Sequence, residues 1–296
     1  MFSLARHFLF ALSIFFALPG FAESIKIPTL RGSLIIVGGG DTPFDVQKRF
    51  VALAGGPGKA RIAVFPMAST EFDEEAMEVV DDFQMLDAEV HVINFTRVEA
   101  QTDAMKHLLE GFSGYWFLGG DQTRLADTLL ATPALETIEQ RYEEGAVVGG
   151  TSAGAAVMTT AMLTGNHHGS PISPKDVATT IARGTFEISK GFGFLPGAIV
   201  DQHFLKRARY NRLLSAVLEQ PQLIGVGIDE ETAILVRPDG FWEVLGASYV
   251  KIFDARQARL TEDHSHVLGA SGITMHLLPA GSVFDPENGR VMLPGG

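Results

Sequence analysis

The sequence predicts an α/β fold with a mostly parallel sheet flanked by helices, and two observations support this prediction. Between residues 33 and 145, short apolar segments alternate with longer segments of helical periodicity, which is the order of βαβ units. The short segments are almost continuously apolar rather than alternating, as expected of strands that are covered on both faces. The chain of 296 residues, 46% of them hydrophobic, is large enough to fold around such a sheet.

The parallel part is expected to contain five strands and four helices. The strands are predicted at 33–40, 60–67, 89–95, 114–120 and 146–150. The helices are predicted at 43–54, 74–87, 102–112 and 123–145, and Thr102 followed by Asp103 is a start signal for the third. Parallel sheets bind ligands at the carboxyl ends of their strands, so the glycine-rich strand ends at 38–40, 119–120 and 149–150 indicate where a site would lie.

The second half of the chain is less regular. From Gly165 to Phe194 the pattern gives way to Gly, Pro, Ser and His, which predicts a long loop or lid. A strand at 197–204 and a helix at 206–220 follow. Five short strands, expected to extend the same sheet, are predicted at 224–229, 232–236, 241–246, 249–254 and 272–278. Because no repeat or linker interrupts the pattern, residues 23–296 are expected to form one domain.

Residues 1–22 have the layout of a secretory signal peptide. Arg6 is followed by an apolar run from Phe8 to Leu18, a Pro-Gly break, and small residues at Gly20 and Ala22. The alternative is a membrane anchor, but the run is shorter than the roughly 20 apolar residues that a spanning helix needs. We therefore expect cleavage before Glu23 and export to the periplasm or the medium, with no membrane attachment afterwards.

Composition excludes several classes of partner and chemistry. The formal charge of −12 argues against nucleic acid and anionic membranes, because both are bound through basic patches. The absence of cysteine excludes disulfides and thiol catalysis. No motif requires a cofactor, and we expect neither a cofactor nor a metal.

The segment Gly150-Thr151-Ser152-Ala153-Gly154 is the strongest functional signal. It has the pattern G-x-S-x-G between a predicted strand and a run of small helix formers, the setting in which such a serine is presented as a nucleophile. Ala153 would be the first residue of the following helix, where its N–H could stabilise an oxyanion. The alternative is a Gly/Ser turn used for tight packing or for holding a phosphate.

A serine nucleophile needs a base, and the base needs a group that orients it. His203 ends one predicted strand in "IVDQHF", and Glu230 follows the next in "IGVGIDEE". If these strands run parallel to the others, both residues lie on the same edge of the sheet as Ser152. Taken singly, His203 would be read as structural; together with the serine and the carboxylate, it is a candidate base.

Four segments, "GGTSAGA", "FLGGDQTRL", "DQHFLKRARYNRL" and "GIDEETA", closely resemble the cyanophycinase branch of the serine peptidases, a group that also includes aspartyl dipeptidase. The resemblance extends from Gly32 to Phe253 with the motifs in the family order. It implies a doubly wound α/β fold related to the glutamine amidotransferase fold. It also implies hydrolysis of β-aspartyl bonds, as in a polymer with a poly-aspartate backbone and arginine side groups, and it suggests a homodimer.

The resemblance also assigns roles to residues. It implies Ser152 as nucleophile, His203 as general base and Glu230 as the carboxylate that orients the base. Asp229 is the alternative third member, and the dipeptidase branch takes its acid from between the serine and the histidine. The N–H of Gly120 matches a second oxyanion donor beside that of Ala153.

Further family positions concern the substrate. Asp121, Gln122, Asp201 and Gln202 match polar residues that line the family's pocket, and Arg207, Arg209 and Arg212 match arginines beside it. From the sequence alone, these arginines are expected on a helix that starts at the site edge, where they would suit carboxylates of a poly-aspartate backbone. The alternative is a solvated helix face paired with local acids, particularly at Arg209. The signal peptide and the loop with His167 and His168 depart from the family pattern, which leaves the exact substrate open.

Three other interpretations each fit a part of the sequence. An esterase of the α/β-hydrolase type would use Ser152 and Asp229 with one of the later histidines, which are His264, His266 and His276. A nucleotide-binding module would use Gly38 and Gly40, but Pro43 occupies the position of the third glycine, and we interpret Gly38–Gly40 as a tight turn at the pocket floor. A metal site at His167-His168 with Asp176 is disfavoured because adjacent histidines diverge on most backbones.

Overall fold

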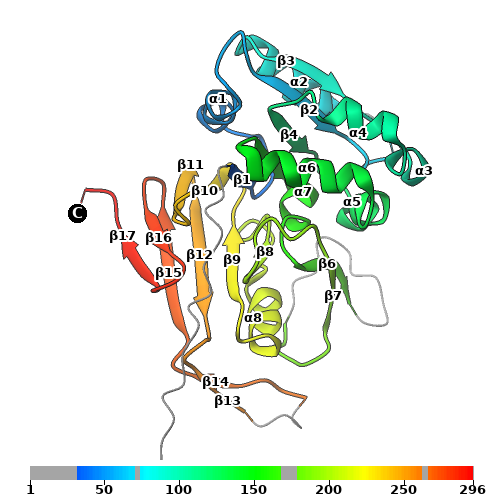
Figure 1. Cartoon of the computed structure of the whole chain (residues 1–296). Helices are drawn as coiled ribbons and strands as arrows, with labels where there is room; N and C mark the ends of the chain where they lie inside the picture. Colours follow the sequence, from blue (N-terminus) through cyan, green and yellow to red (C-terminus); the bar gives the residue numbers. More distant parts are fainter. Residues whose placement is uncertain (1–31, 71–73, 168–178, 262–265, 296) are drawn as a thin grey trace, which may run out of the picture.

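A nine-stranded sheet forms the centre of the computed structural model (Figure 1), which describes residues 32–70, 74–167, 179–261 and 266–295. Its strand order is β17-β16-β11-β10-β1-β5-β4-β2-β3. Five neighbouring strands are parallel: β1 (Ser33–Val37), β5 (Val147–Thr151), β4 (Gly114–Phe117), β2 (Arg61–Phe65) and β3 (Glu89–Val92). The predicted α/β fold is confirmed, and the predicted strands are each present with shifted ends.

Helices cover both faces of this parallel part, as in a doubly wound fold. On one face, α1 (Phe44–Leu53) and α2 (Glu74–Met85) pack Phe50 and Phe83 against Trp116 of β4. On the other face lie α4 (Asp103–Leu109), α5 (Gln122–Leu129) and α6 (Pro133–Glu144), whose apolar side chains join those of β2 and β4 in a second core cluster. Successive strand residues point to opposite faces, so both core clusters draw on the same strands.

The predicted helix at 123–145 is divided in two. Thr132 is extended, caps the second helix by accepting from the N–H of Leu135, and precedes Pro133. A residue before proline avoids the helical region, so the chain has to leave the first helix at this point. The start signal at Thr102 is confirmed, because its hydroxyl accepts from the N–H of Met105. A short helix, α3 (Arg97–Ala100), was missed although Thr96 and Glu99 form a capping box.

The short strands of the second half do not all extend one sheet, which corrects the expectation from sequence. Four of them extend the central sheet beyond β1, each antiparallel to its neighbour: β10 (Thr232–Val236), β11 (Trp242–Gly246), β16 (Val283–Asp285) and β17 (Arg290–Met292). Four others form a separate sheet of order β15-β12-β9-β8: β8 (Ala198–Asp201), β9 (Ile224–Ile228), β12 (Tyr249–Asp254) and β15 (Thr274–Pro279).

The chain crosses between the two sheets at residues 229–231, directly after β9 and before β10 (Figure 1). This crossing brings the end of the second sheet beside the end of β1, because β10 pairs with β1. Residues at the crossing therefore reach the carboxyl edge of the central sheet although β9 belongs to another sheet.

Two further expectations are corrected. The segment 165–194 is not entirely loop, since β6 (Ala161–His167) and β7 (Phe186–Lys190) pair antiparallel within and beside it. The helix predicted at 206–220 begins only at Tyr210, as α8 (Tyr210–Glu219), and residues 202–209 form turns. A short pair, β13 (Arg259–Leu260) and β14 (Ala270–Ser271), completes the described strands. No helix in the described ranges is long and apolar enough to cross a membrane.

Candidate active site

Ser152 occupies the tight turn between β5 and α7 (Ala153–Ala156). Its φ of 52° is positive, which is unusual for a residue with a side chain and marks a strained turn. The neighbours are small because β4 passes close by: a Cβ on Gly150 would lie 2.7 Å from the carbonyl oxygen of Phe117, and one on Gly154 only 2.1 Å from it. The strand, the turn and the helix therefore have the arrangement of a nucleophile elbow.

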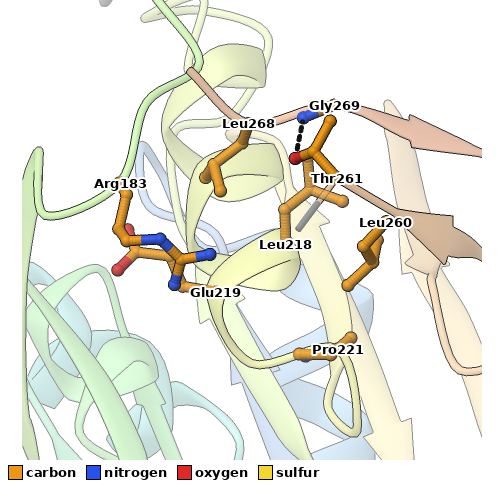
Figure 2. A pocket seen from close by; sticks show the side chains of 8 residues that line it. All are labelled: Arg183, Leu218, Glu219, Pro221, Leu260, Thr261, Leu268 and Gly269. Atoms are coloured by element: carbon orange, nitrogen blue, oxygen red, sulfur yellow. Dashed lines mark hydrogen bonds between the residues drawn. The ribbon is translucent and has the colours of Figure 1, made fainter. Parts of the chain in front are cut away.

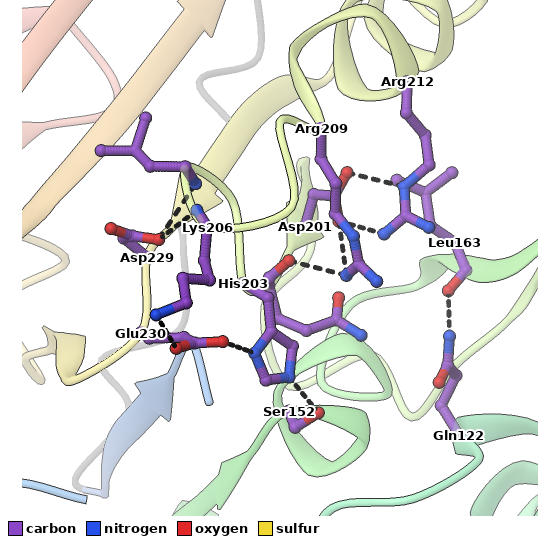
Figure 3. Close-up of polar contacts among 12 residues, drawn as sticks. Gln122, Ser152, Leu163, Asp201, His203, Lys206, Arg209, Arg212, Asp229 and Glu230 are labelled. Atoms are coloured by element: carbon purple, nitrogen blue, oxygen red, sulfur yellow. Dashed lines mark hydrogen bonds and ion pairs between the residues drawn. The ribbon is translucent and has the colours of Figure 1, made fainter. Parts of the chain in front are cut away.

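The hydroxyl of Ser152 lies in a chain of short hydrogen bonds with His203 and Glu230 (Figure 3). Ser152 Oγ is 2.8 Å from His203 Nε2, and His203 Nδ1 is 2.8 Å from Glu230 Oε1. A carboxylate can only accept, so Nδ1 carries the imidazole proton, and Nε2 is left to accept from the hydroxyl. This is the tautomer that a general base for Ser152 needs.

The end of β1 and the glycine turn after it accept hydrogen bonds from the backbone at or next to Ser152, His203 and Glu230. The N–H of Ser152 donates to Val37 O at 3.1 Å, and that of His203 to Gly38 O at 2.6 Å. The N–H of Glu231, next to Glu230, donates to the following carbonyl, that of Gly39, at 2.9 Å.

Gly39 itself lies directly against the imidazole. Its φ is 105°, and a Cβ there would lie 2.2 Å from Cε1 of His203. The turn that the sequence indicated as a pocket floor is thus a support for His203, and only glycine fits it.

Two backbone N–H groups at the same edge of the sheet as the serine are open donors. Within the described residues, neither the N–H of Gly120 nor that of Ala153 donates a hydrogen bond. Ala153 begins α7, and Gly120 follows β4, the strand next to β5. Gly120 has a φ of 131°, and a Cβ there would lie 2.4 Å from Ala68 O. Open donors at a helix start and at a neighbouring strand end suit a developing oxyanion.

Burial dominates the electrostatics of His203. Burial holds its pKa below the ordinary value because it disfavours the charged ring. The hydrogen bond to Glu230 opposes this shift, whereas the positive charges of Arg207 and Arg209 add to it. Lys206 Nζ lies 3.9 Å from the second oxygen of Glu230. At neutral pH the ring is therefore neutral and able to accept a proton.

Asp201 ends β8 as a fully buried carboxylate, and it binds two of the three candidate arginines (Figure 3). Arg212, on α8, donates through Nε at 2.9 Å and through Nη2 to the other oxygen. Arg209 Nη1 lies 3.5 Å from Asp201 and donates to Gln202 O at 2.7 Å. The side chain of Arg207, by contrast, makes no hydrogen bond or ion pair with the described residues.

The arginines therefore differ in a way that the sequence did not show. Only Arg212 lies on a helix, whereas Arg209 and Arg207 precede it in the turns, contrary to the expected common helix. Arg209 and Arg212 are largely buried and neutralised in part by one carboxylate, so Arg207 is the half-buried cation with its charge available.

The other candidate polar residues have mixed surroundings. Gln122 is buried and donates from Nε2 to Leu163 O at 2.6 Å, which fastens β6 to α5. Asp121 caps α5 by accepting from the N–H of Thr123 at 2.8 Å. Gln202 Oε1 is buried and has no partner in the described part of the chain.

Asp229 and the later histidines do not complete the arrangement. Asp229 accepts from backbone N–H groups and from Ser248, and it makes no hydrogen bond to the imidazole ring of His203. His276 belongs to β15 and packs against Phe284 with the two rings tilted, and the hydroxyl of Ser152 bonds to His203 instead. His264, His168 and Asp176 lie outside the described residues. No three His, Cys, Asp or Glu side chains within the described ranges gather in a metal-binding arrangement.

A small cavity lies elsewhere, between the end of α8 and the β13–β14 pair (Figure 2). Arg183, Leu218 and Leu268 are among its lining residues, and none of the candidate site residues borders it.

The site has a serine on a strand-to-helix turn, and this serine is hydrogen-bonded to a histidine that is in turn hydrogen-bonded to a carboxylate. This arrangement defines a serine-type hydrolase. The model of peptidase family S51 matches residues 34–244. The chain therefore belongs to peptidase family S51 and is a serine-type peptidase.

Two relatives match most of the chain in sequence. A cyanophycinase from Geminocystis herdmanii is 34% identical over 84% of this chain and 90% of its own length. A cyanophycinase from a Nostoc species is 34% identical over 87% of this chain and 86% of its own.

Solved structures are similar in fold. A peptidase from an acI-B1 actinobacterium has a TM-score of 0.61 at 24% identity and covers 83% of this chain and 98% of its own. A putative peptidase E protein from Listeria monocytogenes has a TM-score of 0.52 at 16% identity, covering 73% of this chain and 99% of its own.

Proposed function

We propose that this peptidase hydrolyses β-aspartyl bonds and that its substrate is cyanophycin, which it cuts to β-Asp-Arg dipeptides. The observation that carries the proposal is the hydrogen-bonded chain from Ser152 through His203 to Glu230. The substrate class is supported by relatives that are named cyanophycinases and match most of the chain.

The geometry supports the following sequence of steps. Ser152 Oγ attacks the side-chain-derived carbonyl of a β-aspartyl unit while Nε2 of His203 takes the hydroxyl proton. Glu230 stabilises the imidazolium that forms, and the N–H groups of Ala153 and Gly120 receive the oxyanion. His203 then protonates the leaving amine, and water hydrolyses the acyl-enzyme with the same histidine as base.

Charge near the serine supports a substrate that carries carboxylates. Asp201 contributes one negative charge beside three guanidinium groups, so the cluster is positive in an otherwise acidic chain. We assign the direct contact to Arg207, whose charge is not neutralised by the described residues, and a supporting role to Arg209 and Arg212. Asp121, Gln122 and Gln202 complete the proposed polar lining of the pocket.

The test is hydrolysis of insoluble β-Asp-Arg polymer by the mature protein, with Ser152→Ala in parallel. Clearing by the wild type, with a loss of about 10⁴-fold or more in the variant, is the expected result. If the polymer is not cleared but a small isoaspartyl dipeptide is cut in a Ser152-dependent way, the second candidate holds, an exported isoaspartyl dipeptidase-like enzyme. If neither is cut, the proposed substrate class is wrong.

Export and assembly are further proposals that rest on the sequence and on the family resemblance. We propose cleavage of residues 1–22, which lie outside the described residues, and a homodimer. Mass spectrometry of the protein recovered from the periplasm or the medium of its host should show a chain beginning at Glu23, and an intact N-terminus would refute export by this route. Light scattering should give twice the chain mass, and a monomer would refute the dimer.

A further inference from the structure

The turn that begins at His203 lacks the side-chain cap that such a turn normally has. The N–H of Arg207 donates to His203 O at 2.9 Å, so residues 203–207 form one helical turn with His203 at its start. The first residue of a helical turn usually accepts, through its own side chain, from the N–H groups two and three residues on. The ring of His203 is turned toward Ser152 and Glu230 and is not available for this role.

Asp229, in the crossing after β9, supplies the missing acceptor. Its Oδ1 accepts from the N–H of Leu205 and from that of Lys206, each at 3.0 Å, which are the second and third residues after His203 (Figure 3). Its Oδ2 accepts from Ser248 Oγ at 2.8 Å, so both carboxylate oxygens are held. The carboxylate thus caps the turn in place of the histidine side chain.

Asp229 and Glu230 therefore hold His203 from two sides. Glu230 binds the ring at Nδ1, whereas Asp229 fixes the backbone that carries the ring. The backbone needs fixing because the φ of His203 is 48°, a conformation that persists in a residue with a side chain only when its surroundings enforce it. The carbonyl of Gly38, which accepts from the N–H of His203, is the other restraint.

We propose that Asp229 is a positioning residue for the general base: by capping the turn at Leu205 and Lys206, it frees the imidazole of His203 for Ser152 and keeps Nε2 in line with the hydroxyl. The inference rests on the proposed function of Ser152 and His203, and it gives a role to a carboxylate that makes no hydrogen bond to either the serine or the imidazole.

The experiment measures the reaction of the full chain with a fluorophosphonate, which phosphonylates Ser152 only when a base activates it. In this step the Ser152 oxygen bonds to phosphorus, fluoride leaves, and His203 takes the proton. The probe does not depend on the identity of the peptide substrate. The maximal labelling rate and the half-saturating probe concentration are measured for the wild type and for Asp229→Ala, Asp229→Asn and Ser248→Ala.

The expected result separates rate from binding. Asp229→Ala should lower the maximal labelling rate by about 10²-fold, because a base displaced by about 1 Å loses its alignment, and should leave the half-saturating concentration within about twofold. Asp229→Asn should recover most of the rate, because its amide oxygen can still accept from both N–H groups. Ser248→Ala, which removes one hydrogen bond from Asp229, should lower the rate by about two- to tenfold.

Asp285→Ala is the matched control. Asp285 also accepts from two backbone N–H groups, those of Glu287 and Asn288 at 3.1 and 3.2 Å, but it ends β16 and hydrogen-bonds to no candidate site residue. It should reduce stability, measured by thermal unfolding, and leave labelling unchanged.

Two outcomes would overturn the inference. One is unchanged labelling in folded Asp229→Ala; the other is an equal loss in Asp229→Ala and Asp285→Ala, which would reduce the effect to stability. If Asp229→Ala does not fold, Asp229→Asn and Ser248→Ala decide: a loss of about 10²-fold in Asp229→Asn, or no loss in Ser248→Ala, refutes the capping role. A wild type that is not labelled at Ser152 would instead refute the proposed function, and the inference would fall with it.

Discussion

Asp201 is the carboxylate that pairs with the guanidinium groups of both Arg209 and Arg212, and no other carboxylate in the described residues pairs with them. Replacing Asp201 by Asn removes this negative charge. The change keeps the size of the side chain, so no cavity forms and the effect is electrostatic. Asp201 is fully buried, and the side chains of Arg209 and Arg212 are 11% and 8% exposed. Neither arginine can regain water without moving out of the turn and helix that hold it.

The magnitude follows from this burial. Removing one partner of a buried ion pair leaves an uncompensated charge and costs about 3–5 kcal/mol of unfolding free energy. Arg209 keeps one hydrogen bond, to Gln202 O, and Asn can still accept one bond from Arg212, so we expect a loss near the lower end of that range. A loss of about 3 kcal/mol is a large share of the stability of a domain of this kind.

Urea unfolding followed by tryptophan fluorescence measures the loss, since Trp116 and Trp242 are both buried. The midpoint should fall with an unchanged m value, because the folded structure is kept. Asp239→Asn is the matched control. Asp239 binds Arg237 at the surface, with side chains 52% and 32% exposed, and its loss should cost less than about 1 kcal/mol. An equally small loss for Asp201→Asn would refute the conclusion that Asp201 neutralises a buried pair of arginines.

Three further predictions concern the catalytic arrangement. The acid limb of kcat/KM against pH should lie below pH 6.5, because burial lowers the pKa of His203 and only the neutral ring accepts a proton. Arg207→Ala removes a positive charge that lowers this pKa, so it should move the acid limb to higher pH. An acid limb that does not move would contradict the assignment of this limb to His203. Glu230→Gln should lower kcat by about 10²- to 10⁴-fold with KM nearly unchanged, since it removes the carboxylate that fixes the tautomer; equal turnover by both proteins would show that Glu230 does not orient the base. Gly39→Ala should cost about 10²-fold or more in kcat because its Cβ would displace the imidazole, whereas the matched Gly56→Ala, also at positive φ but with nothing within 4 Å, should keep full turnover.

The strands and the turn at Ser152 that were predicted from local sequence patterns are present in the structure. Hydrophobic periodicity and turn chemistry depend on residues that are close together in the chain, so the sequence shows them directly. Continuous apolar runs located the five parallel strands, and G-x-S-x-G located the strand–turn–helix around Ser152. The break at Thr132 and Pro133 was also readable, since both a cap and a proline stand there, but the long helical pattern around it obscured the signal. The helix start near Tyr210 was misplaced because the turns before it are held by contacts with distant residues.

The distant contacts decided the rest. Sequence periodicity does not show which sheet a short strand joins, so the second sheet and the crossing at residues 229–231 could not be foreseen. The choice between Asp229 and Glu230 depends on that crossing, which turns Glu230 to the ring of His203 and Asp229 to the backbone behind it. The sequence by itself determined the fold class and the residue types of the site. The tertiary structure alone decided which carboxylate meets which partner, because hydrogen bonds and ion pairs are set by distances in space that adjacency in the chain does not encode.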